Sequence, residues 1–527
     1  MLMAVNAQLL NLCVVVAYLL VIVGVGGYFA FKRKTADRFM VANRSIPGWA
    51  IGLSMFGSYI SSISFLANPA SSFAGNWLWA AFTLVTPIGL WLGATVFVRH
   101  YRRCGAVSAY SHLESRFGPW ARAYAVFTFL VIQMARMGTI LFLLSQAVLA
   151  LLGGDPAHDL GLARTIIIVV GLLMTFYTLF GGIEAVVWTG VVQSIVLLAG
   201  PLICLAALLL KTPGGMGAIM AVGIEHDKFS FGPYDWSVAA PTFWLVAVTS
   251  ILGHVQGWAT DQSYIQRYIS ARSDKEAARS VWIAGLLYMP AACFFWFIGT
   301  ALFAFYQAWP QRLPADTPPD AVFPHFIAQE LWPGLSGLVI AAIFAASMDS
   351  NLNSMATLTL VDGYKRYLRP RAGDRESLGV LYLATLFWGL ASIGYGLGMT
   401  LKGATTTIEF SARVGGLLGG GILGMVLLGM LWRRVTSGIA ATATVLGVLT
   451  ILWVTLSRWG LWPEAWSAYV SPIHEIAAGL VGTMVIVGVG LGLAALRAAV
   501  QRRRPADMPQ QSAPAPAVPT REANEAV

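Results

Sequence analysis

Apolar runs long enough to cross a bilayer follow one another along almost the whole chain, separated by short polar segments. A helix needs about 20 predominantly apolar residues to span the hydrocarbon core of a membrane. By this measure we predict about thirteen transmembrane helices, at residues 9–31, 46–75, 77–98, 120–152, 163–181, 185–210, 240–266, 278–306, 335–364, 377–400, 403–431, 436–457 and 472–499. The pattern therefore predicts an all-α polytopic membrane protein.

Composition and charge support this class. Hydrophobic residues make up 57% of the chain and charged residues only 11%, which is too little polar surface for a soluble protein of this size. Short cytoplasmic loops are rich in Lys and Arg, and the inner segments hold most of the 34 basic residues, Arg267 among them, if the N-terminus lies outside. The outer segments then carry only Arg164, Lys211, Lys228, Arg312, Lys402 and Arg458. An odd number of spans places the C-terminus in the cytoplasm, so the net charge of +10 reflects topology and requires no nucleic-acid partner.

The second span contains many small polar residues. Residues 54–65 hold several serines together with Gly57, inside an otherwise apolar run. Such residues can satisfy an unwound backbone within a membrane and still offer oxygen atoms to a ligand. We therefore predict that this helix is broken and carries part of a binding site. The alternative is that small residues only allow close helix packing.

Two arginines, Arg136 and Arg413, lie inside apolar spans. A charge within the membrane is costly, so such a residue is a binding or gating candidate by default. The planar guanidinium of Arg136 matches a carboxylate through two parallel hydrogen bonds, which makes an organic acid the first substrate class to consider. For Arg413 we prefer an ion pair with Glu409, which precedes it by four residues on the same helical face.

The seventh span also contains small polar residues. Residues 249–257 predict a second break, because equivalent interruptions five spans apart are typical of an inverted repeat. His254 lies in this segment, although a single histidine on a helix is more often a packing residue than a pH sensor.

The ninth span carries hydroxyl groups at helical spacing. Ser347, Ser350 and Ser354 follow one another at steps of three and four residues, so they share one helix face. Hard cations prefer oxygen ligands, and this face together with backbone carbonyls of the second span would suit a monovalent cation. Asp349 is a candidate ion ligand or proton acceptor. A polar packing seam is the alternative.

Several short motifs occur in the order found in the sodium/solute symporter family, namely those at residues 61–65, 107–117, 181–189, 266–268 and 341–354. The chain resembles this family from about residue 35 to 434, and most closely the bacterial sialic acid transporters. The resemblance implies a leucine-transporter-type fold with two inverted five-helix repeats, in which a sodium gradient drives alternating access. The repeats would cover residues 46–210 and 240–431. Residues 1–31 would form an extra N-terminal helix, residues 436–499 two additional helices, and residues 502–527 a disordered cytoplasmic tail.

The resemblance also implies roles for the polar residues. Sodium ion, the co-transported cation, would be held by the carbonyls of Gly57 and Ile60 and by hydroxyls of the ninth span, for which Ser347 and Ser350 are the candidates. The solute would lie against Ser61, Ser64 and Thr83, and Arg136 matches the arginine that binds the carboxylate in the sialic acid transporters.

Three features depart from the family pattern. The ninth span is about three residues shorter before its Leu-Asn-Ser motif, which leaves the choice between Ser347 and Ser350 open. Gly190 stands where some members carry an aspartate tied to a second sodium, so we expect one sodium per solute. Thr83 stands where the sialic acid transporters have a glutamine near the substrate, which weakens the case for sialic acid itself.

We therefore predict a sodium-coupled symporter of the bacterial inner membrane that imports a small polar solute bearing a carboxylate, either sialic-acid-like or another organic acid. The alternatives are a neutral sugar or polyol symporter with Arg136 in an internal polar network, proton coupling through Asp349, and a sensor that binds its solute without moving it. The sequence contains no recognisable pair of nucleophile and base and no metal-ligand cluster, so we do not expect an enzyme. It does not indicate the oligomeric state.

Overall fold

The structure is a computed structural model that describes residues 2–30, 35–61, 63–105, 107–154, 159–347, 351–401, 421–458 and 464–503. These residues form helices joined by short loops, and no strand occurs among them. The first half contains α1 (Leu2–Ala30), α2 (Ala36–Val41), η1 (Ala42–Arg44), α3 (Gly48–Tyr59), η2 (Ile63–Ala67), α4 (Asn68–Ala74), η3 (Leu78–Ala80), α5 (Ala81–Leu84), α6 (Thr86–Leu92), η4 (Gly93–Phe97), α7 (Val98–Cys104), α8 (Ser111–Phe117), α9 (Pro119–Leu151), α10 (Leu160–Lys211) and α11 (Gly215–Glu225).

The second half contains α12 (Phe243–Thr260), α13 (Gln262–Ile269), α14 (Asp274–Ala308), η5 (Pro310–Arg312), α15 (Pro319–Gln329), α16 (Leu335–Ser347), α17 (Asn351–Leu358), η6 (Thr359–Leu368), α18 (Asp374–Met399), α20 (Ser437–Leu456), η7 (Glu464–Tyr469), η8 (Glu475–Ala477) and α21 (Ala478–Arg503). A further apolar helix covers Gly421–Leu431.

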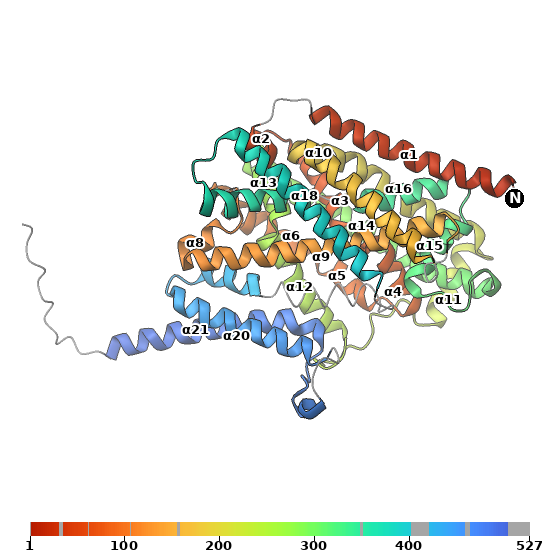
Figure 1. Ribbon diagram of the computed structural model, residues 1–527. Helices are drawn as coiled ribbons and strands as arrows, with labels where there is room; N and C mark the ends of the chain where they lie inside the picture. Colours follow the sequence, from red (N-terminus) through yellow and green to blue (C-terminus); the bar gives the residue numbers. More distant parts are fainter. Residues whose placement is uncertain are drawn as a thin grey trace, which may run out of the picture.

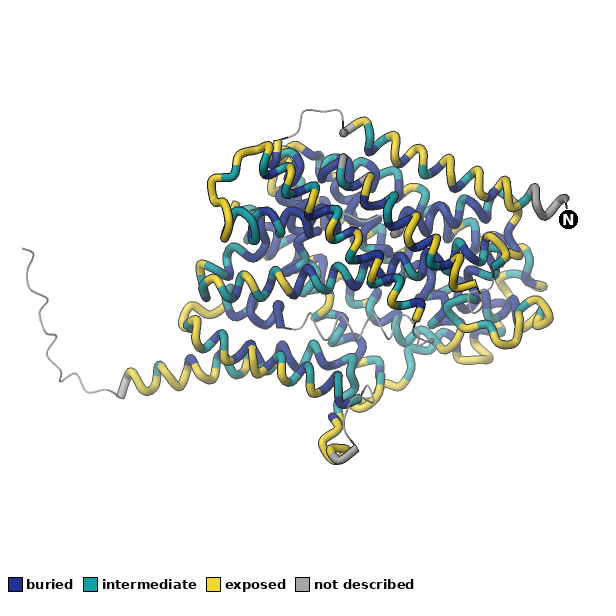
Figure 2. Tube along the Cα trace, viewed as in Figure 1, coloured by how far each residue is buried: buried dark blue, intermediate teal, exposed yellow. Residues whose placement is uncertain are grey.

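The long helices lie roughly along one common axis (Figure 1). Helices α3, α10, α14 and α16 pack against one another in the interior, where most residues are buried (Figure 2). Helix α1 lies along the outside of this bundle, while α20 and α21 form a hairpin at its edge. In the described part of the chain, eight helices are long and apolar enough to cross a membrane, or nine if α3 and α4 count as one bent span.

The fifth and sixth predicted spans are consecutive parts of α10, and the helix kinks sharply between them at Gly182. This glycine has φ 61° and ψ −170°, and an added Cβ would lie within 3.1 Å of backbone atoms of Phe39 in α2. A side chain at this position would therefore be strained and would also collide with α2. The glycine allows the chain to turn where the two helices meet.

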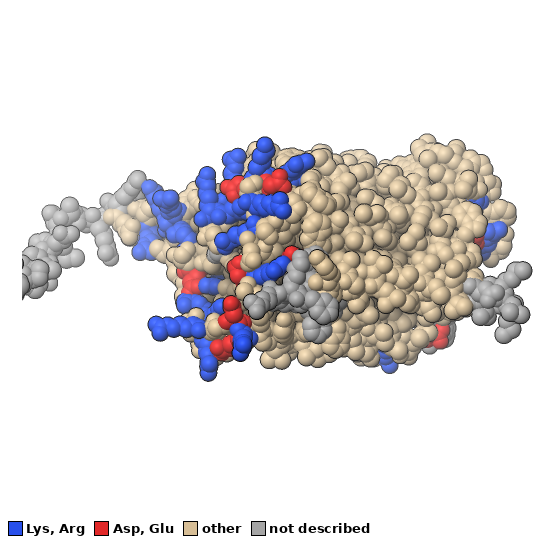
Figure 3. Space-filling model, turned by 90° about the horizontal axis from the view of Figure 1, so that it is seen from above, with Lys and Arg blue, Asp and Glu red and all other residues tan. Residues whose placement is uncertain are grey.

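Basic side chains gather at one end of the bundle, the end where α21 projects (Figure 3). Part of this end is held by ion pairs between α8, the start of α9 and η6. Arg122 bonds both Glu114, at 2.8 Å, and Asp362, while Arg366 bonds Glu114 as well. The hydrogen bond from Arg122 lowers the pKa of the Glu114 carboxyl below its usual value. Glu114 therefore stays ionised near neutral pH and links α8 to the start of α9 and to η6.

The buried side-chain amide of Asn11 links helix α1 to the start of α16. The Asn11 side-chain oxygen accepts hydrogen bonds from the backbone N–H groups of Gly334, at 2.6 Å, and Gly337, at 3.2 Å. These groups lie at the start of α16, where the first N–H groups of a helix have no partner within the helix. An added Cβ at Gly337 would come within 2.5 Å of the Asn11 carbonyl oxygen. Asn11 thus caps α16 from a neighbouring helix at very close approach.

We expect Asn11→Leu to lower the stability of the detergent-solubilised protein by about 1 kcal/mol, because it leaves two N–H groups of α16 unsatisfied within the membrane. A lower midpoint of thermal unfolding would show this loss. Gln8→Ala, at an exposed position of the same helix, is the matched control. An unchanged midpoint in Asn11→Leu would mean that the cap is not needed.

Candidate functional site

The second span is broken, as its serine-rich sequence predicts. Helix α3 ends at Tyr59, and Ile60 has extended backbone angles of φ −92° and ψ 108°. The chain resumes as a turn of π-helix, η2, and then as α4, and the two halves meet at an angle of 56°. The break lies deep inside the bundle, because Ile60 and Ser61 are both buried.

This break releases backbone oxygen atoms. The Ile60 N–H still bonds the Phe56 carbonyl at 3.2 Å, and the Phe65 N–H bonds the Ser61 carbonyl at 2.9 Å. Among the hydrogen bonds of the described residues, none from beyond α3 reaches the carbonyl of Gly57 or Ile60. Buried carbonyls normally have partners, and inside a membrane an unsatisfied one costs several kcal/mol. These two oxygens are therefore well suited to a cation.

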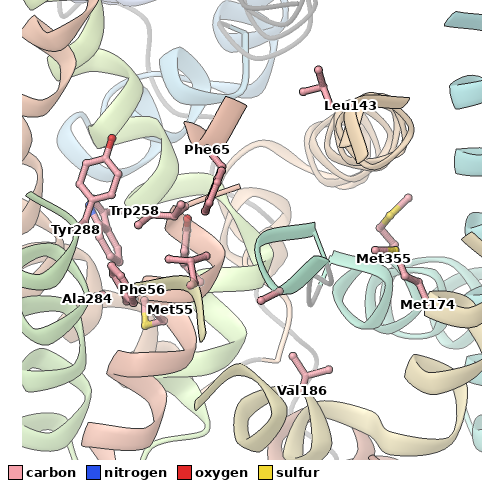
Figure 4. Packing of buried hydrophobic residues seen from close by; sticks show 14 of the residues in the cluster. Met55, Phe56, Phe65, Leu143, Met174, Val186, Trp258, Ala284, Tyr288 and Met355 are labelled. Carbon is pink, nitrogen blue, oxygen red and sulfur yellow. The ribbon is translucent and has the colours of Figure 1, made fainter. Parts of the chain in front are cut away.

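Helix α14 runs beside both halves of the broken span. The contacts keep a nearly constant offset along the two chains, and they pair Gly48 with Glu276, Gly52 with Ser280, Tyr59 with Tyr288, Phe65 with Phe295, Ser72 with Thr300 and Phe73 with Phe303. Figure 4 shows the inner part of this contact, with Met55 and Phe56 of α3 near Ala284 and Tyr288 of α14. Helix α14 thus packs against α3 and α4 in one continuous alignment, although the second span is interrupted between them.

Pro290 interrupts the hydrogen bonding of α14 at the level of the break. It follows Tyr288, whose ring centroid lies 4.5 Å from that of Tyr59, and precedes Phe295, whose centroid lies 4.9 Å from that of Phe65. Proline within a helix removes one backbone hydrogen bond. Both members of this helix pair therefore have their weakest backbone at the same depth.

Helices α3 and α10 approach each other closely beside the break. An added Cβ at Gly190 would lie 2.5 Å from the Ser54 hydroxyl oxygen, and one at Gly57 would lie 3.0 Å from the Ser194 hydroxyl oxygen. The Ser194 hydroxyl donates to the carbonyl of Leu53 at 2.6 Å or to that of Gly190 at 2.7 Å. The backbone that presents the Gly57 carbonyl is thus fixed from one side by α10.

Arg136 of α9 points toward the broken span. Its Nη2 donates to the Ser58 carbonyl at 3.4 Å, and the residue is partly buried. A second guanidinium reaches the same residue, because Arg267 of α13 donates to the Ser58 hydroxyl at 2.6 Å. Arg267 is 1% exposed, so its guanidinium is buried among helices although the sequence groups it with the basic residues of a cytoplasmic segment. No local pattern marks this burial, because all eight residues of α13 are buried, polar and apolar alike.

The seventh span is interrupted, but not at the predicted position. Helix α12 is continuous through residues 249–257, and the break comes at Asp261, where φ is −82° and ψ is 111°. The Asp261 carboxylate accepts hydrogen bonds from the Ser263 N–H at 2.8 Å and from the Gln133 amide at 3.0 Å. The small residues at 249–257 are accommodated within a continuous helix, and Asp261, an N-capping aspartate, follows the end of α12 and starts α13.

His254 is a packing residue, in line with the more common role of such histidines. Its ring nitrogens lie within hydrogen-bonding distance of the Tyr59 hydroxyl, the Thr86 hydroxyl and the Phe82 carbonyl. The ring also stacks on Tyr59 with a centroid distance of 6.0 Å. All of these partners lie in α3, α5 and α6, so the histidine joins α12 to these elements.

The predicted solute residues lie around the break. Ser61 is buried and Ser64 is half-buried in η2. Thr83 of α5 is 3% exposed, and its hydroxyl accepts a hydrogen bond from the Trp296 indole N–H at 3.4 Å. Through Trp296, Thr83 is therefore linked to α14, the helix that also carries the register of the broken span.

The ninth span approaches the break from the other side. Helix α16 contacts α3, and Ala342 and Phe65 both lie against Gly200 of α10. Ser347 is the last residue of α16, whereas Asp349 and Ser350 lie outside the described residues, as do Glu409 and Arg413. Ser354 is fully buried in α17.

Helix α13 is tied to the ninth span on the far side of Asp261. The Gln266 amide donates to the Met40 carbonyl in α2 and to the Thr357 hydroxyl in α17 at 3.1 Å. Gln266 and Thr357 are both fully buried. These bonds, together with those of Gln133 and Arg136, close one side of the site between α3, α9, α13 and α17.

Comparison with known proteins identifies the family. The profile of the sodium:solute symporter family matches residues 39–447. The chain belongs to the sodium:solute symporter family. Among its relatives is the sodium/sialic acid symporter SiaT of Proteus mirabilis (strain HI4320), which is 29% identical over 485 residues, 91% of this chain and 94% of the relative.

Two other relatives show the breadth of the family. The sodium/sialic acid symporter NanT of Aliivibrio fischeri (strain ATCC 700601 / ES114) is 27% identical over 489 residues, 91% of this chain and 92% of the relative. The sodium-coupled monocarboxylate transporter 1 of Homo sapiens is 26% identical over 454 residues, 84% of this chain and 72% of the relative.

Solved structures show the fold. A Na+-coupled sialic acid symporter in a substrate-bound, outward-open state superposes with a TM-score of 0.82 and 29% identity, covering 92% of this chain and 98% of that chain. The nucleobase-cation symporter Mhp1 in a closed conformation gives a TM-score of 0.54 at 16% identity, covering 88% and 94%. This symporter therefore has the leucine-transporter-type fold that its motifs imply.

We expect Gly190→Ala to destabilise the symporter by about 1 to 3 kcal/mol, because the new methyl group would force α3 and α10 apart. The half-saturating sodium concentration should rise as well, since the Gly57 carbonyl lies in the displaced segment. Thermal unfolding and sodium titrations measure the two effects. Gly394→Ala in α18, with no atom within 4 Å of the new Cβ, is the control. A Gly190→Ala variant that matches Gly394→Ala would show that the close approach is unimportant.

Proposed function

We propose that this symporter uses an inward sodium gradient to import a small organic solute through its carboxylate. The observation that carries the proposal is the position of Arg136, which leaves α9 inside the membrane and reaches the broken span at Ser58. Placing a charged guanidinium inside a membrane costs free energy, and such residues are retained where they have a function. Its fork geometry suits a carboxylate better than a neutral hydroxyl.

The charges around Ser58 support an anionic solute. Arg136 and Arg267 both bond this residue, and Asp261 is linked to α9 through Gln133. A carboxylate that reaches these guanidinium groups can accept charge-assisted hydrogen bonds, which are about twice as strong as those of a neutral solute.

For sodium we propose the carbonyls of Gly57 and Ile60 together with hydroxyls of Ser347 and Ser350. Asp349 is an additional candidate ligand or proton acceptor. Gly190 offers no carboxylate for a second ion, so we propose one sodium per solute. At a membrane potential of ~100 mV, each charge that moves inward contributes roughly 2.3 kcal/mol. Sodium would act by stabilising the outward-facing form that loads the solute.

Sialic acids and simpler carboxylates are the substrate classes to test. Two relatives are named as sialic acid symporters and others as monocarboxylate transporters, and both kinds of solute carry a carboxylate. We propose that Ser61, Ser64 and Thr83 contact the rest of the solute. The threonine at position 83 makes a solute other than sialic acid an equal candidate.

We further propose a multi-pass arrangement in the bacterial inner membrane with the N-terminus outside and the C-terminus inside. The gathering of basic side chains at one end supports this orientation, because cytoplasmic segments are rich in Lys and Arg (Figure 3). The proposed units are residues 1–31, the repeats at 46–210 and 240–431, the two helices at 436–499, and a tail at 502–527. The proposed role is transport and not catalysis.

The test is uptake into proteoliposomes, with N-acetylneuraminate, lactate, amino acids and glucose each assayed in sodium and in potassium. Arg136→Ala should raise the KM of the imported carboxylate by about 30- to 150-fold, because a charge-assisted hydrogen bond contributes roughly 2 to 3 kcal/mol. Arg136→Lys should recover only part of this loss, since it keeps the charge but not the fork.

Arg164→Ala is the control. Arg164 lies near the start of α10, and its guanidinium donates to the Thr400 hydroxyl after α18 and not to the broken span. Glucose uptake that survives Arg136→Ala would support the neutral-sugar alternative, in which Arg136 only completes an internal polar network. Binding without flux would indicate a sensor. Uptake that depends on a proton gradient and not on sodium would contradict the proposed coupling.

A further inference from the structure

Lys228 lies in the loop between α11 and α12, outside the binding site, yet it is only 5% exposed. A lysine is rarely buried to this degree unless its ammonium group has partners. Here the ammonium donates to the Phe73 carbonyl at 2.7 Å and to the Gly75 carbonyl at 3.0 Å. It also lies 3.8 Å from the centre of the Phe303 ring. Two main-chain oxygens and one aromatic face thus surround the charge.

These two carbonyls belong to the outer end of the broken span. Helix α4 ends at Ala74, with Gly75 as its C-cap. The last carbonyls of a helix lack partners within the helix and carry its negative dipole end. A cation at this position therefore binds the backbone of α4, independently of the side chains that α4 carries.

The same end of α4 is held from α14 and from the loop. The Thr300 hydroxyl bonds both the Ser72 hydroxyl, at 3.1 Å, and the Trp77 indole N–H, at 3.0 Å. An added Cβ at Gly299 would lie 2.3 Å from the Pro69 carbonyl oxygen, so the two backbones touch. The backbone N–H of Trp77 donates to the Ser230 carbonyl at 2.9 Å. Helix α4, the outer half of α14 and residues 228–230 therefore form one unit, which we call the outer clamp.

The direction of α4 cannot come from the chain itself. Among the described residues, no backbone N–H bonds the Ile60 carbonyl to continue the helix of α3 into α4, and α4 is only seven residues long. Its direction is therefore set by what holds its outer end. Ser64, the candidate solute contact, lies in η2 directly before α4, so the outer clamp also determines where that hydroxyl lies.

We propose that Lys228 is a positioning residue for transport: by holding the outer end of α4, it places the broken span for sodium and solute without touching either. This inference rests on the proposed function of the break. It explains why the charge of Lys228 is buried at the end of a short helix, although this lysine forms no ion pair among the described residues.

The test compares Lys228→Met, which keeps most of the side-chain volume but removes the charge, with Lys211→Met. Lys211 is the matched control, because its ammonium also donates to a main-chain carbonyl, that of Glu330, but at the end of α15 and not of α4. The probes are sodium chloride against potassium chloride, followed by tryptophan fluorescence, and N-acetylneuraminate uptake in proteoliposomes. Hydrogen–deuterium exchange of residues 63–75 reports on α4 directly.

In Lys228→Met we expect half-saturating sodium and the KM for N-acetylneuraminate to rise by about tenfold, with the maximal rate per folded protein within about twofold. Amide exchange should become faster in residues 63–75 only. Lys228→Arg should recover most of the affinity, because it restores a donor to both carbonyls. If Lys228→Met does not fold, Thr300→Val loosens the same end of α4 and should give the same pattern.

Unchanged exchange in α4, or an equal loss of affinity in Lys211→Met, would overturn the proposal. So would a loss that falls entirely on the amount of folded protein in both Lys228→Met and Thr300→Val. If the wild-type protein shows no response to sodium and no uptake of any carboxylate, the proposed function fails instead. The exchange experiment still decides in that case whether Lys228 positions α4.

Discussion

A helix that is broken inside a membrane must be held together by something other than its own hydrogen bonds. After Tyr59 the α-helical hydrogen bonding of the second span is interrupted, and lipid cannot supply partners for the freed backbone groups. Helix α14 supplies the missing continuity, because its contacts keep the same offset on both sides of the break. The freed carbonyls can then remain open toward a cation while the surrounding structure stays ordered. The other features of the site depend on this constraint.

The two halves of the broken span are held by different means. On the α3 side, glycines and serines allow α10 and α14 to approach until backbone and hydroxyl atoms touch, which leaves little freedom. On the α4 side, Gly299 of α14 also comes into contact with the Pro69 backbone, and buried polar contacts from Thr300 and Lys228 are added at the end of the short helix. Both halves are thus held by their neighbours on either side of the break. Pro290 gives α14 a matching weak point at the same depth.

Charged side chains from distant parts of the chain come together beside the break. Arg136, Arg267 and Asp261 come from three different helical segments and meet through Ser58 and Gln133. Only Arg136 could be recognised in advance, because it stands within a long apolar run. Arg267 lies near a cluster of basic residues in the sequence, so its burial could not be seen there. The meeting of two guanidinium groups at Ser58 is therefore a property of the folded structure and not of any single motif.

Much of the architecture follows from the sequence, because the membrane imposes simple rules on length, hydrophobicity and charge. Apolar runs and motif order were sufficient for the helical class and the family, and the serines of residues 54–65 were sufficient for the first break. The second break was misplaced by several residues, since the small polar residues at 249–257 lie within a continuous helix and the break comes at the N-capping Asp261. A local sequence pattern indicates which residues a helix can accommodate, but not where the helix ends. Which carbonyls are freed, which arginine is buried and what holds the end of α4 are decided by contacts between residues far apart in the chain, and only the tertiary structure contains them.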